Sequence, residues 1–140
     1  MTLQEEIIKE LKVRPSIDAQ EEIIKRIAFL KQYLIASNMK GYVLGISGGQ
    51  DSTLAGKLVQ MAIDELNKEE GRKKYAFYAL RLPYGKQFDE QDAQDALKFI
   101  QPDYAFTIDI RPAVDAAYET FCQTIGTPLS DFNKGNLKAR

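Results

Sequence analysis

The segment Ser-Gly-Gly-Gln-Asp-Ser that begins at Ser47 combines the groups that could hold a polyphosphate at the start of a helix. Gly48 and Gly49 carry no Cβ, so a phosphate could approach their backbone N–H groups closely. Ser47 and Ser52 offer hydroxyl donors, and Asp51 offers a hard carboxylate oxygen of the kind that Mg²⁺ prefers. Because the positive end of the helix dipole also favours an anion, the segment predicts a site for a nucleotide triphosphate.

The same residues allow an alternative that needs no ligand. A Gly-Gly turn could be closed by Asp51 acting as the N-cap of the following helix. Two better-known phosphate motifs do not occur in the sequence. Gly56 and Lys57 are followed by Leu58, so there is no Gly-x-x-x-x-Gly-Lys-Ser/Thr, and there is no Gly-x-Gly-x-x-Gly. The sequence therefore disfavours kinase-like P-loops and dinucleotide-binding turns.

The elements around this segment predict an α/β fold with a parallel sheet. Capping boxes that start at Thr2 and Asp18 predict two leading helices. Three apolar runs then alternate with helical patterns that begin after the glycine turn, at Asp89 and near Pro112. The expected strands are residues 42–46, 75–82 and 104–110. This βαβαβα order places ligands at the carboxyl ends of the strands, and the first strand is expected to be buried on both faces.

The composition is that of one soluble globular domain. The 140 residues carry a net charge of −1, with 28% charged and 44% hydrophobic residues. Basic side chains are spread along the chain, so a basic nucleic-acid interface is not expected. No apolar run approaches the roughly 18 residues of a membrane span, and the first residues do not resemble a secretory signal. We therefore expect a cytoplasmic protein with no membrane or nucleic-acid partner.

The cysteine and histidine content limits the chemistry further. Cys122 is the only cysteine, and the sequence contains no histidine. This composition excludes a disulfide within the chain, a Cys/His zinc site and a Cys-His or Ser-His catalytic pair. Cys122 is expected to be a small buried apolar residue on its helix. Binding of ATP and Mg²⁺ needs none of these groups, because it depends on electrostatics and orientation.

The last residues differ in kind from the α/β core. Residues 130–136 are expected to form a loop, and residues 137–140 to form the first turn of another helix. A chain that ends in a helix start suggests a truncated sequence rather than a natural terminus. The expected organisation is a helical segment at 1–40, a nucleotide-binding α/β core at 41–125, and a substrate loop with a truncated helix at 126–140.

The glycine turn resembles the pyrophosphate loop of the N-type ATP pyrophosphatases, and the chain as a whole is similar to the bacterial ammonia-dependent NAD synthetases. The residues that carry this likeness are Thr2-Leu3-Gln4, Leu44 to Gly56, Arg81-Leu82-Pro83-Tyr84-Gly85, Asp131 to Asn136 and Lys138-Ala139-Arg140. The resemblance implies an adenine nucleotide alpha hydrolase-like, Rossmann-like fold. It also implies a ligase that forms a C–N bond. Such an enzyme adenylates deamido-NAD with ATP and lets ammonia attack the acyl-adenylate, which yields NAD⁺, AMP and pyrophosphate.

The resemblance assigns binding roles to individual positions and assigns no catalytic residue. The implied ATP contacts are Gly45, Ile46, Ser47, Gly48, Gly49, Gln50, Asp51, Ser52, Arg81 and Gln87, with Asp51 as the Mg²⁺ ligand. The implied deamido-NAD contacts are Tyr33, Phe132, Asn136 and Arg140. Phe132 would stack on the pyridine ring, and Arg140 would pair with an anionic group. The alternatives are a solvated strand end for Arg81, a loop side chain for Gln87 and core packing for Tyr33.

The resemblance also implies a homodimer in which the leading helices face a partner chain and the dinucleotide lies across the subunit boundary. Members of that family are much longer, and their second half carries further Mg²⁺, phosphate and dinucleotide ligands. We therefore expect this chain alone to keep the loop but to have little or no synthetase activity.

Two other classes of function stay open. One is another N-type ATP pyrophosphatase, such as a GMP, argininosuccinate or asparagine synthetase or a tRNA-modifying enzyme. The absence of a basic face and of paired cysteines disfavours the tRNA-modifying and sulfur-transferring members. The other is a non-catalytic nucleotide-binding or dimerisation module.

Overall fold

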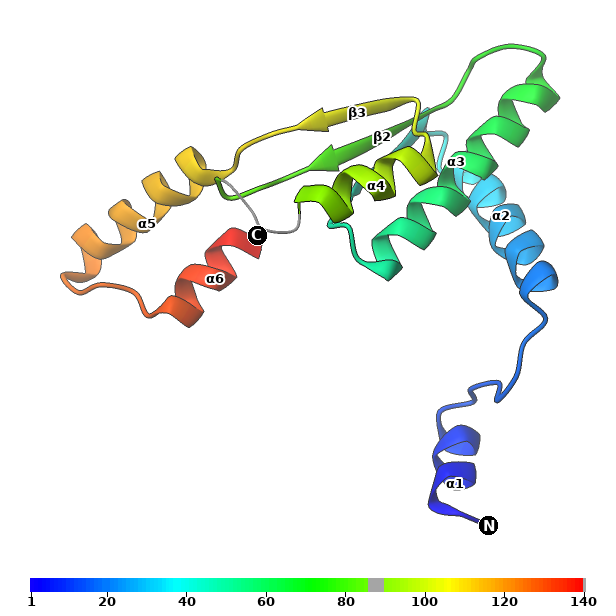
Figure 1. Ribbon diagram of the computed structural model, residues 1–140, viewed down its shortest axis with the longest axis horizontal. Helices are drawn as coiled ribbons and strands as arrows, with labels where there is room; N and C mark the ends of the chain where they lie inside the picture. The colour runs from blue at the N-terminus through cyan, green and yellow to red at the C-terminus, as the bar shows by residue number, and fades with distance from the viewer. Residues whose placement is uncertain (86–89, 140) are drawn as a thin grey trace.

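The computed structural model describes residues 1–85 and 90–139. The expected helix start at Asp89 therefore lies outside the described residues. The elements, in chain order, are α1 (Leu3–Glu10), α2 (Ala19–Ala36), β1 (Gly41–Gly45), α3 (Gln50–Glu70), β2 (Ala76–Arg81), α4 (Glu90–Ile100), β3 (Tyr104–Thr107), α5 (Arg111–Ile125) and α6 (Asp131–Ala139) (Figure 1). This order confirms the predicted α/β fold.

The three strands form one parallel sheet in the order β1-β2-β3. Gly45 at the end of β1 pairs with Leu80, and Arg81 at the end of β2 pairs with Thr107. The carboxyl ends of the strands therefore meet at one edge, and the chain segments that follow them lie together there. The arrowheads of β2 and β3 in Figure 1 point toward the start of α5.

The core lies between one face of the sheet and helices α2, α3 and α4. The largest fully buried side chains are Phe77 of β2, Leu34 of α2, Ile63 of α3 and Ile100 of α4. Helices α3 and α4 pack closely at Gly56, where a Cβ would lie 2.8 Å from Ile100 Cδ1, the end of that side chain. This packing fixes the start of α3 at the carboxyl end of β1.

The opposite face of the sheet is exposed. Side chains of Val43, Tyr78, Tyr104 and Phe106 are open to solvent, and the rings of Tyr78 and Tyr104 stack with centroids 4.8 Å apart. The prediction that the first strand is buried on both faces is therefore wrong. A continuous apolar run is typical of a strand with two covered faces, but the run does not show which elements cover each face.

The third strand is shorter than predicted, because β3 ends at Thr107. Ile108 N still donates to Arg81 O at 2.8 Å. The Asp109 carboxylate then accepts N–H bonds from Gly85 and Arg111, so the chain turns into α5.

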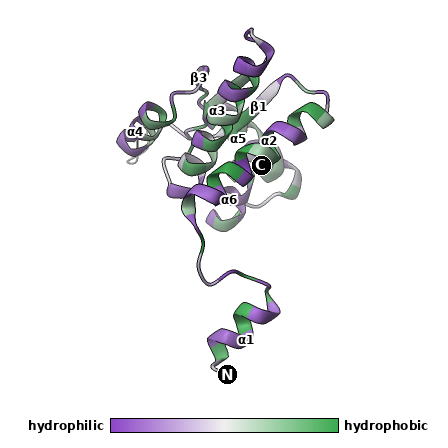
Figure 2. Ribbon diagram, turned by 90° about the vertical axis from the view of Figure 1, so that its right-hand side faces the viewer, coloured by the Kyte–Doolittle hydropathy of each residue, from purple (hydrophilic) through white to green (hydrophobic). Residues whose placement is uncertain are grey.

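The two leading helices begin where the capping boxes predict. The Thr2 hydroxyl and the Glu5 carboxylate cap α1 reciprocally, and Asp18 caps α2. The second helix ends at Ala36, before the predicted boundary near Gly41. Figures 1 and 2 both show α1 apart from the other helices, and α1 has no buried residue. No helix of residues 1–85 and 90–139 is long and apolar enough to cross a bilayer.

Two predictions for the C-terminal region are wrong. Residues 131–136 belong to α6 and not to a loop, because the Ser130 hydroxyl accepts the N–H of Asn133 at 3.2 Å and starts the helix. Lys134 of α6 then lies over the Tyr118 ring of α5, 4.6 Å from its centroid. Cys122 is only half-buried, since its helix α5 has few elements packed around it.

Candidate functional site

The candidate site is the connection between β1 and α3. Gly49 is the N-cap of α3, with φ −75° and ψ 167°, and no side chain closes the helix start. The alternative in which Asp51 is the N-cap is therefore wrong. Within residues 1–85 and 90–139, no acceptor contacts the N–H groups of Gln50, Asp51 or Ser52. These amides are free to bind an anion, and the helix dipole favours one at this position.

Gly48 needs to be glycine for two independent reasons. Its φ of +92° lies in the region that residues with a Cβ rarely adopt. A Cβ at this position would also lie 2.8 Å from the backbone nitrogen of Ala93 in α4. The turn of the loop is therefore packed directly on the first part of α4.

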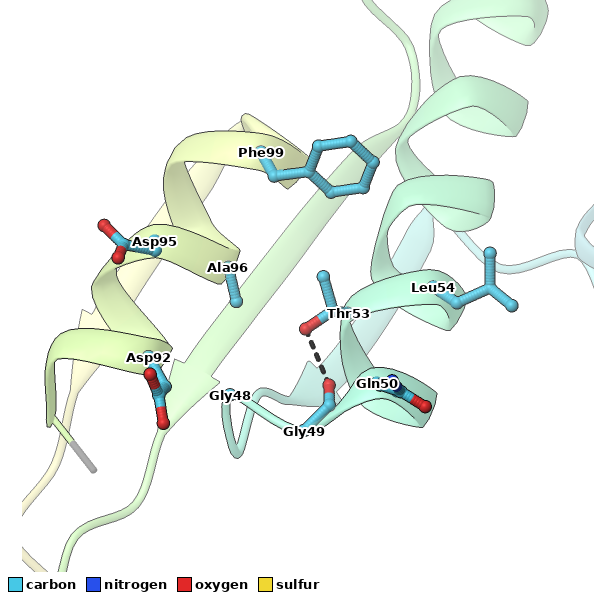
Figure 3. Close-up of a pocket in the computed structure, with 9 residues that line it drawn as sticks. All are labelled: Gly48, Gly49, Gln50, Thr53, Leu54, Asp92, Asp95, Ala96 and Phe99. Atoms are coloured by element: carbon cyan, nitrogen blue, oxygen red, sulfur yellow. Dashed lines mark hydrogen bonds between the residues drawn. The ribbon is translucent and has the colours of Figure 1, made fainter. Parts of the chain in front are cut away.

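Two serine hydroxyls close the loop on itself. The Ser47 N–H donates to Ser52 Oγ, and the Gly49 N–H donates to Ser47 Oγ, each at 3.2 Å. The two hydroxyl oxygens are 3.0 Å apart. Thr53 adds a bond from its hydroxyl to Gly49 O at 2.7 Å, which Figure 3 draws as a dashed line. A bound phosphate would take over the bonds that the two serines now make with each other.

Arg81 is buried beneath the loop and is only 3% exposed. One terminal nitrogen donates to Ile46 O at 3.1 Å and lies 3.5 Å from Ser47 O. The other donates to the Glu90 carboxylate of α4 at 2.7 Å. Its Nε has no partner among the described residues. The alternative of a solvated strand end is therefore wrong, and Arg81 connects β2, the loop and α4.

A cavity of 440 Å³ lies beside the loop, between the start of α3 and one face of α4 (Figure 3). Its lining residues are Gly48, Gly49, Gln50, Thr53, Leu54, Asp92, Asp95, Ala96 and Phe99. The two carboxylates on the α4 wall would repel phosphate, while Phe99 and Leu54 offer apolar surface. Phosphate groups are therefore better placed at the amides of α3 than against α4.

Sequence reasoning missed the contribution of α4. Asp92, Asp95 and Phe99 follow one another at steps of three and four residues, the spacing that places side chains on one helical face. That spacing was available in the sequence. It does not show which neighbouring segment this helical face meets.

Asp51 lies away from the cavity beside the glycines. It lines a separate groove of 360 Å³ between α2 and α3, together with Arg26, Phe29 and Leu30. No group of three or more metal-ligating side chains occurs in the described part of the chain. Asp51 offers one carboxylate to this groove.

The described residues predicted to contact deamido-NAD lie on two separate helices, α2 and α6. Tyr33 on α2 is 60% exposed and stacks on Phe29, with ring centroids 6.0 Å apart, so the core-packing alternative is wrong. Phe132 is 78% exposed and Asn136 is exposed, both on α6. Figure 1 shows α2 and α6 toward opposite ends of the molecule. The remaining predicted contacts, Gln87 and Arg140, lie outside the described residues.

Comparisons with known proteins place this architecture in a family. The "NH(3)-dependent NAD(+) synthetase" of Halalkalibacterium halodurans is 62% identical over 138 residues, which cover 99% of this chain and 51% of the relative. The protein of the same description from Lysinibacillus sphaericus is 60% identical over 141 residues, with coverages of 100% and 51%. The chain therefore spans about half the length of the curated relatives that it matches.

Solved structures and a family model agree with these relatives. The crystal structure of the NAD+ synthetase of Burkholderia pseudomallei aligns with a TM-score of 0.84 and 40% identity, covering 96% of this chain and 49% of that one. The family model described as NAD synthase matches residues 22–140. The likeness inferred from the sequence motifs is thus confirmed, and the chain belongs to the NAD synthase family.

Proposed function

We propose that this chain provides the ATP-binding part of an ammonia-dependent NAD⁺ synthetase, a ligase that converts deamido-NAD into NAD⁺. The observation that carries the proposal is the uncapped start of α3 behind a glycine loop, in a chain that is 62% identical to a relative described as an NH(3)-dependent NAD(+) synthetase. A cytoplasmic location stays a prediction from the sequence.

The loop residues would bind the ATP phosphates through backbone groups. The free amides of Gln50, Asp51 and Ser52 converge at the positive end of α3, where an anion replaces water as their partner. Gly48 allows close approach, and the hydroxyls of Ser47 and Ser52 turn from each other to the phosphate oxygens. We propose Gly45, Ile46 and Gly49 as further contacts of this loop, and Arg81 as its support from below.

The proposed reaction has two steps that balance without a redox partner. The nicotinate carboxylate attacks the α-phosphorus of ATP, and the α,β-phosphoanhydride bond breaks to release pyrophosphate. Ammonia then attacks the acyl-adenylate carbonyl, loses a proton and displaces AMP. The proposed contribution of the chain itself is to hold and orient ATP at the start of α3.

Titration calorimetry with ATP and Mg²⁺, followed by an assay for AMP and pyrophosphate with deamido-NAD and ammonia, tests this proposal. Binding of ATP to the chain would support the proposal. Formation of NAD⁺ once the second half of a longer family member is added would also support it. Failure of the chain to bind any adenine nucleotide would contradict it. Pyrophosphate release with other carboxyl acceptors, but not with deamido-NAD, would indicate a different N-type pyrophosphatase.

Replacing Asp51 by asparagine is expected to weaken Mg²⁺-dependent ATP binding by about tenfold, because the amide is a poorer ligand for a hard cation than the carboxylate. Calorimetry with and without Mg²⁺ measures the effect. Glu65→Gln on the same helix serves as a control that removes an exposed carboxylate away from the loop. An Asp51→Asn affinity equal to that of the unsubstituted chain would remove Asp51 from the metal role.

We propose that the chain acts as a homodimer. Tyr33 and Phe132 are assigned to the same dinucleotide by family resemblance, yet α2 and α6 lie toward opposite ends of one chain. Two copies could bring these residues to one ligand. The exposed apolar side chains Ile24, Phe29 and Tyr33 on α2 offer a surface for the contact.

Replacing Phe29 by serine is expected to raise the dimer dissociation constant by about tenfold or more, because an aromatic side chain buried at an interface contributes roughly 1.5–3 kcal/mol. Sedimentation velocity over a dilution series measures the change. Phe121→Ser on α5 is the matched control, since Phe121 is also exposed but lies on another helix. Equal effects of the two substitutions would contradict a dimer formed through α2.

A second candidate function is nucleotide binding without turnover. One observation favours it for the chain by itself. Tyr33 and Phe132, both assigned to deamido-NAD, lie on α2 and α6, which are toward opposite ends of one chain. Binding of ATP with no AMP formation under any acceptor would support this function.

A further inference from the structure

The first turn of α4 contacts the glycine loop from two directions. Below the loop, the guanidinium of Arg81 joins the Ile46 carbonyl to the Glu90 carboxylate, with N–O distances of 3.1 and 2.7 Å. Beside the loop, the backbone of Gly48 packs on the α4 backbone at Ala93. The loop is therefore fixed to α4 by one charged connection and one direct backbone contact.

We propose that Glu90 is a positioning residue for the phosphate loop, which acts by orienting the Arg81 guanidinium beneath it. The inference rests on the proposed function of the loop as an ATP phosphate site. Among the described residues, the side-chain hydrogen bonds of Glu90 are with Arg81 and Gln94, so its proposed effect on the loop passes through Arg81.

The burial of Arg81 explains why it needs a fixed carboxylate. A guanidinium that is 3% exposed has lost its water, and the carbonyls of Ile46 and Ser47 replace only part of it. The Glu90 carboxylate supplies the only opposite charge that pairs with it among the described residues. Without that charge, only the bonds from one terminal nitrogen of Arg81 to the two loop carbonyls would orient the guanidinium.

Glu90 is itself held in place. Its second carboxylate oxygen accepts a bond from Gln94 Nε2 at 2.7 Å, one turn further along α4. This bond, together with the bond from Arg81, holds the pKa of Glu90 below its usual range. The carboxylate is therefore charged at neutral pH, and the chain of contacts from Gln94 to Ile46 is continuous.

Arg81 also sets the direction of the two loop amides that follow the carbonyls it holds. Each peptide unit is planar, so a carbonyl fixed toward Arg81 turns the following N–H to the opposite side. The carbonyls of Ile46 and Ser47 point to the guanidinium below the loop. The N–H groups of Ser47 and Gly48 therefore point away from it, toward the side on which the serine hydroxyls and the start of α3 lie.

Amide hydrogen exchange on the ligand-free chain tests the positioning role directly. Glu90→Gln keeps the shape of the side chain and removes its charge. We expect exchange of the loop amides, residues 47–53, to become about three- to tenfold faster, with the core amides of β2 unchanged. Glu70→Gln is the matched control, because it breaks the exposed Glu70–Lys74 pair at the far end of α3.

If Glu90→Gln disturbs the fold, the milder variant Gln94→Met tests the same proposal. Gln94→Met removes only the bond that orients Glu90, so it should accelerate the same loop amides by a smaller factor. Loop exchange equal to that of Glu70→Gln would overturn the proposal. Acceleration spread evenly over the core in both variants would also overturn it, because Glu90 would then be a general stabilising residue.

ATP affinity gives a second measurement, and the two possible roles of Glu90 predict changes in opposite directions. A positioning role predicts that Glu90→Gln weakens ATP binding by about three- to tenfold, in step with the loss of loop protection. Tighter binding would overturn the role, since Glu90 would then compete with the nucleotide for Arg81. If the unsubstituted chain bound no ATP, the proposed function would fail, while the exchange experiment would still decide whether Glu90 positions the loop.

Discussion

Substitution of Gly48 by alanine is expected to lower ATP affinity by more than tenfold. The new Cβ would lie 2.8 Å from the Ala93 nitrogen in α4, a contact with backbone that no side-chain movement can relieve. A φ of +92° adds about 1–3 kcal/mol of strain for a residue other than glycine. The loop must therefore move away from α4, which displaces the amides at the start of α3. Calorimetry with ATP and Mg²⁺ measures the loss.

Gly126→Ala separates the geometry of the site from backbone strain. Gly126 ends α5 with a φ of +79°, and a Cβ there would meet nothing within 4 Å. This variant should lose a similar amount of stability from its positive φ and yet keep the ATP affinity of the unsubstituted chain. If Gly48→Ala and Gly126→Ala bound ATP equally well, the packing of the loop on α4 would have no part in nucleotide binding.

Local signals explain which parts of the fold the sequence predicts. The capping boxes at Thr2 and Asp18 act within one turn of their own helices, so the starts of α1 and α2 follow directly from adjacent residues. The glycine loop is equally local, and alternation of strands and helices fixes a parallel sheet with right-handed crossovers. The order of the elements along the chain and the parallel direction of the strands were predictable for this reason.

One error concerns contacts between distant segments, and the other concerns a local cap. Apolar strands are expected to be covered on both faces, yet Val43 and Phe106 are exposed because the helices that pack on the described sheet lie on its other side. Residues 131–136 contain Asn and Gly, which favour loops, but Ser130 caps them into a helix. Lys134 of this helix then lies over the ring of Tyr118 in α5. The exposure of the sheet face depends on tertiary contact, whereas the Ser130 cap is a local signal that the sequence contains.

Arg81 shows the same limit within the site. Its position at the end of a strand predicts a residue near the ligand edge, and the structure places Arg81 at the end of β2. The sequence does not show that the Arg81 side chain turns inward. Its direction depends on bonds to Ile46, which is distant in sequence, and to Glu90, which lies outside the Arg81 motif. The resemblance assigns Arg81 to the nucleotide. In the structure, Arg81 instead holds the backbone of the glycine loop, which is the part proposed to bind the nucleotide.

Replacement of Phe77 by alanine is expected to cost about 3–5 kcal/mol of unfolding free energy, the usual penalty for removing a large core aromatic side chain. Phe77 has no exposed surface and lies in the cluster formed by the sheet with α2, α3 and α4. Since whole domains are stable by only about 5–15 kcal/mol, this one change could unfold much of the population. Urea denaturation followed by circular dichroism measures it.

Phe106→Ala is the matched comparison from the other face of the same sheet. Phe106 is 50% exposed, so truncation leaves no closed cavity and should cost less than about 1 kcal/mol. The two variants remove the same side chain from adjacent strands, and only the covering of the face differs. A penalty for Phe106→Ala as large as that for Phe77→Ala would mean that another surface covers the aromatic face in solution. If a second copy of the chain were that surface, dilution would reduce the penalty.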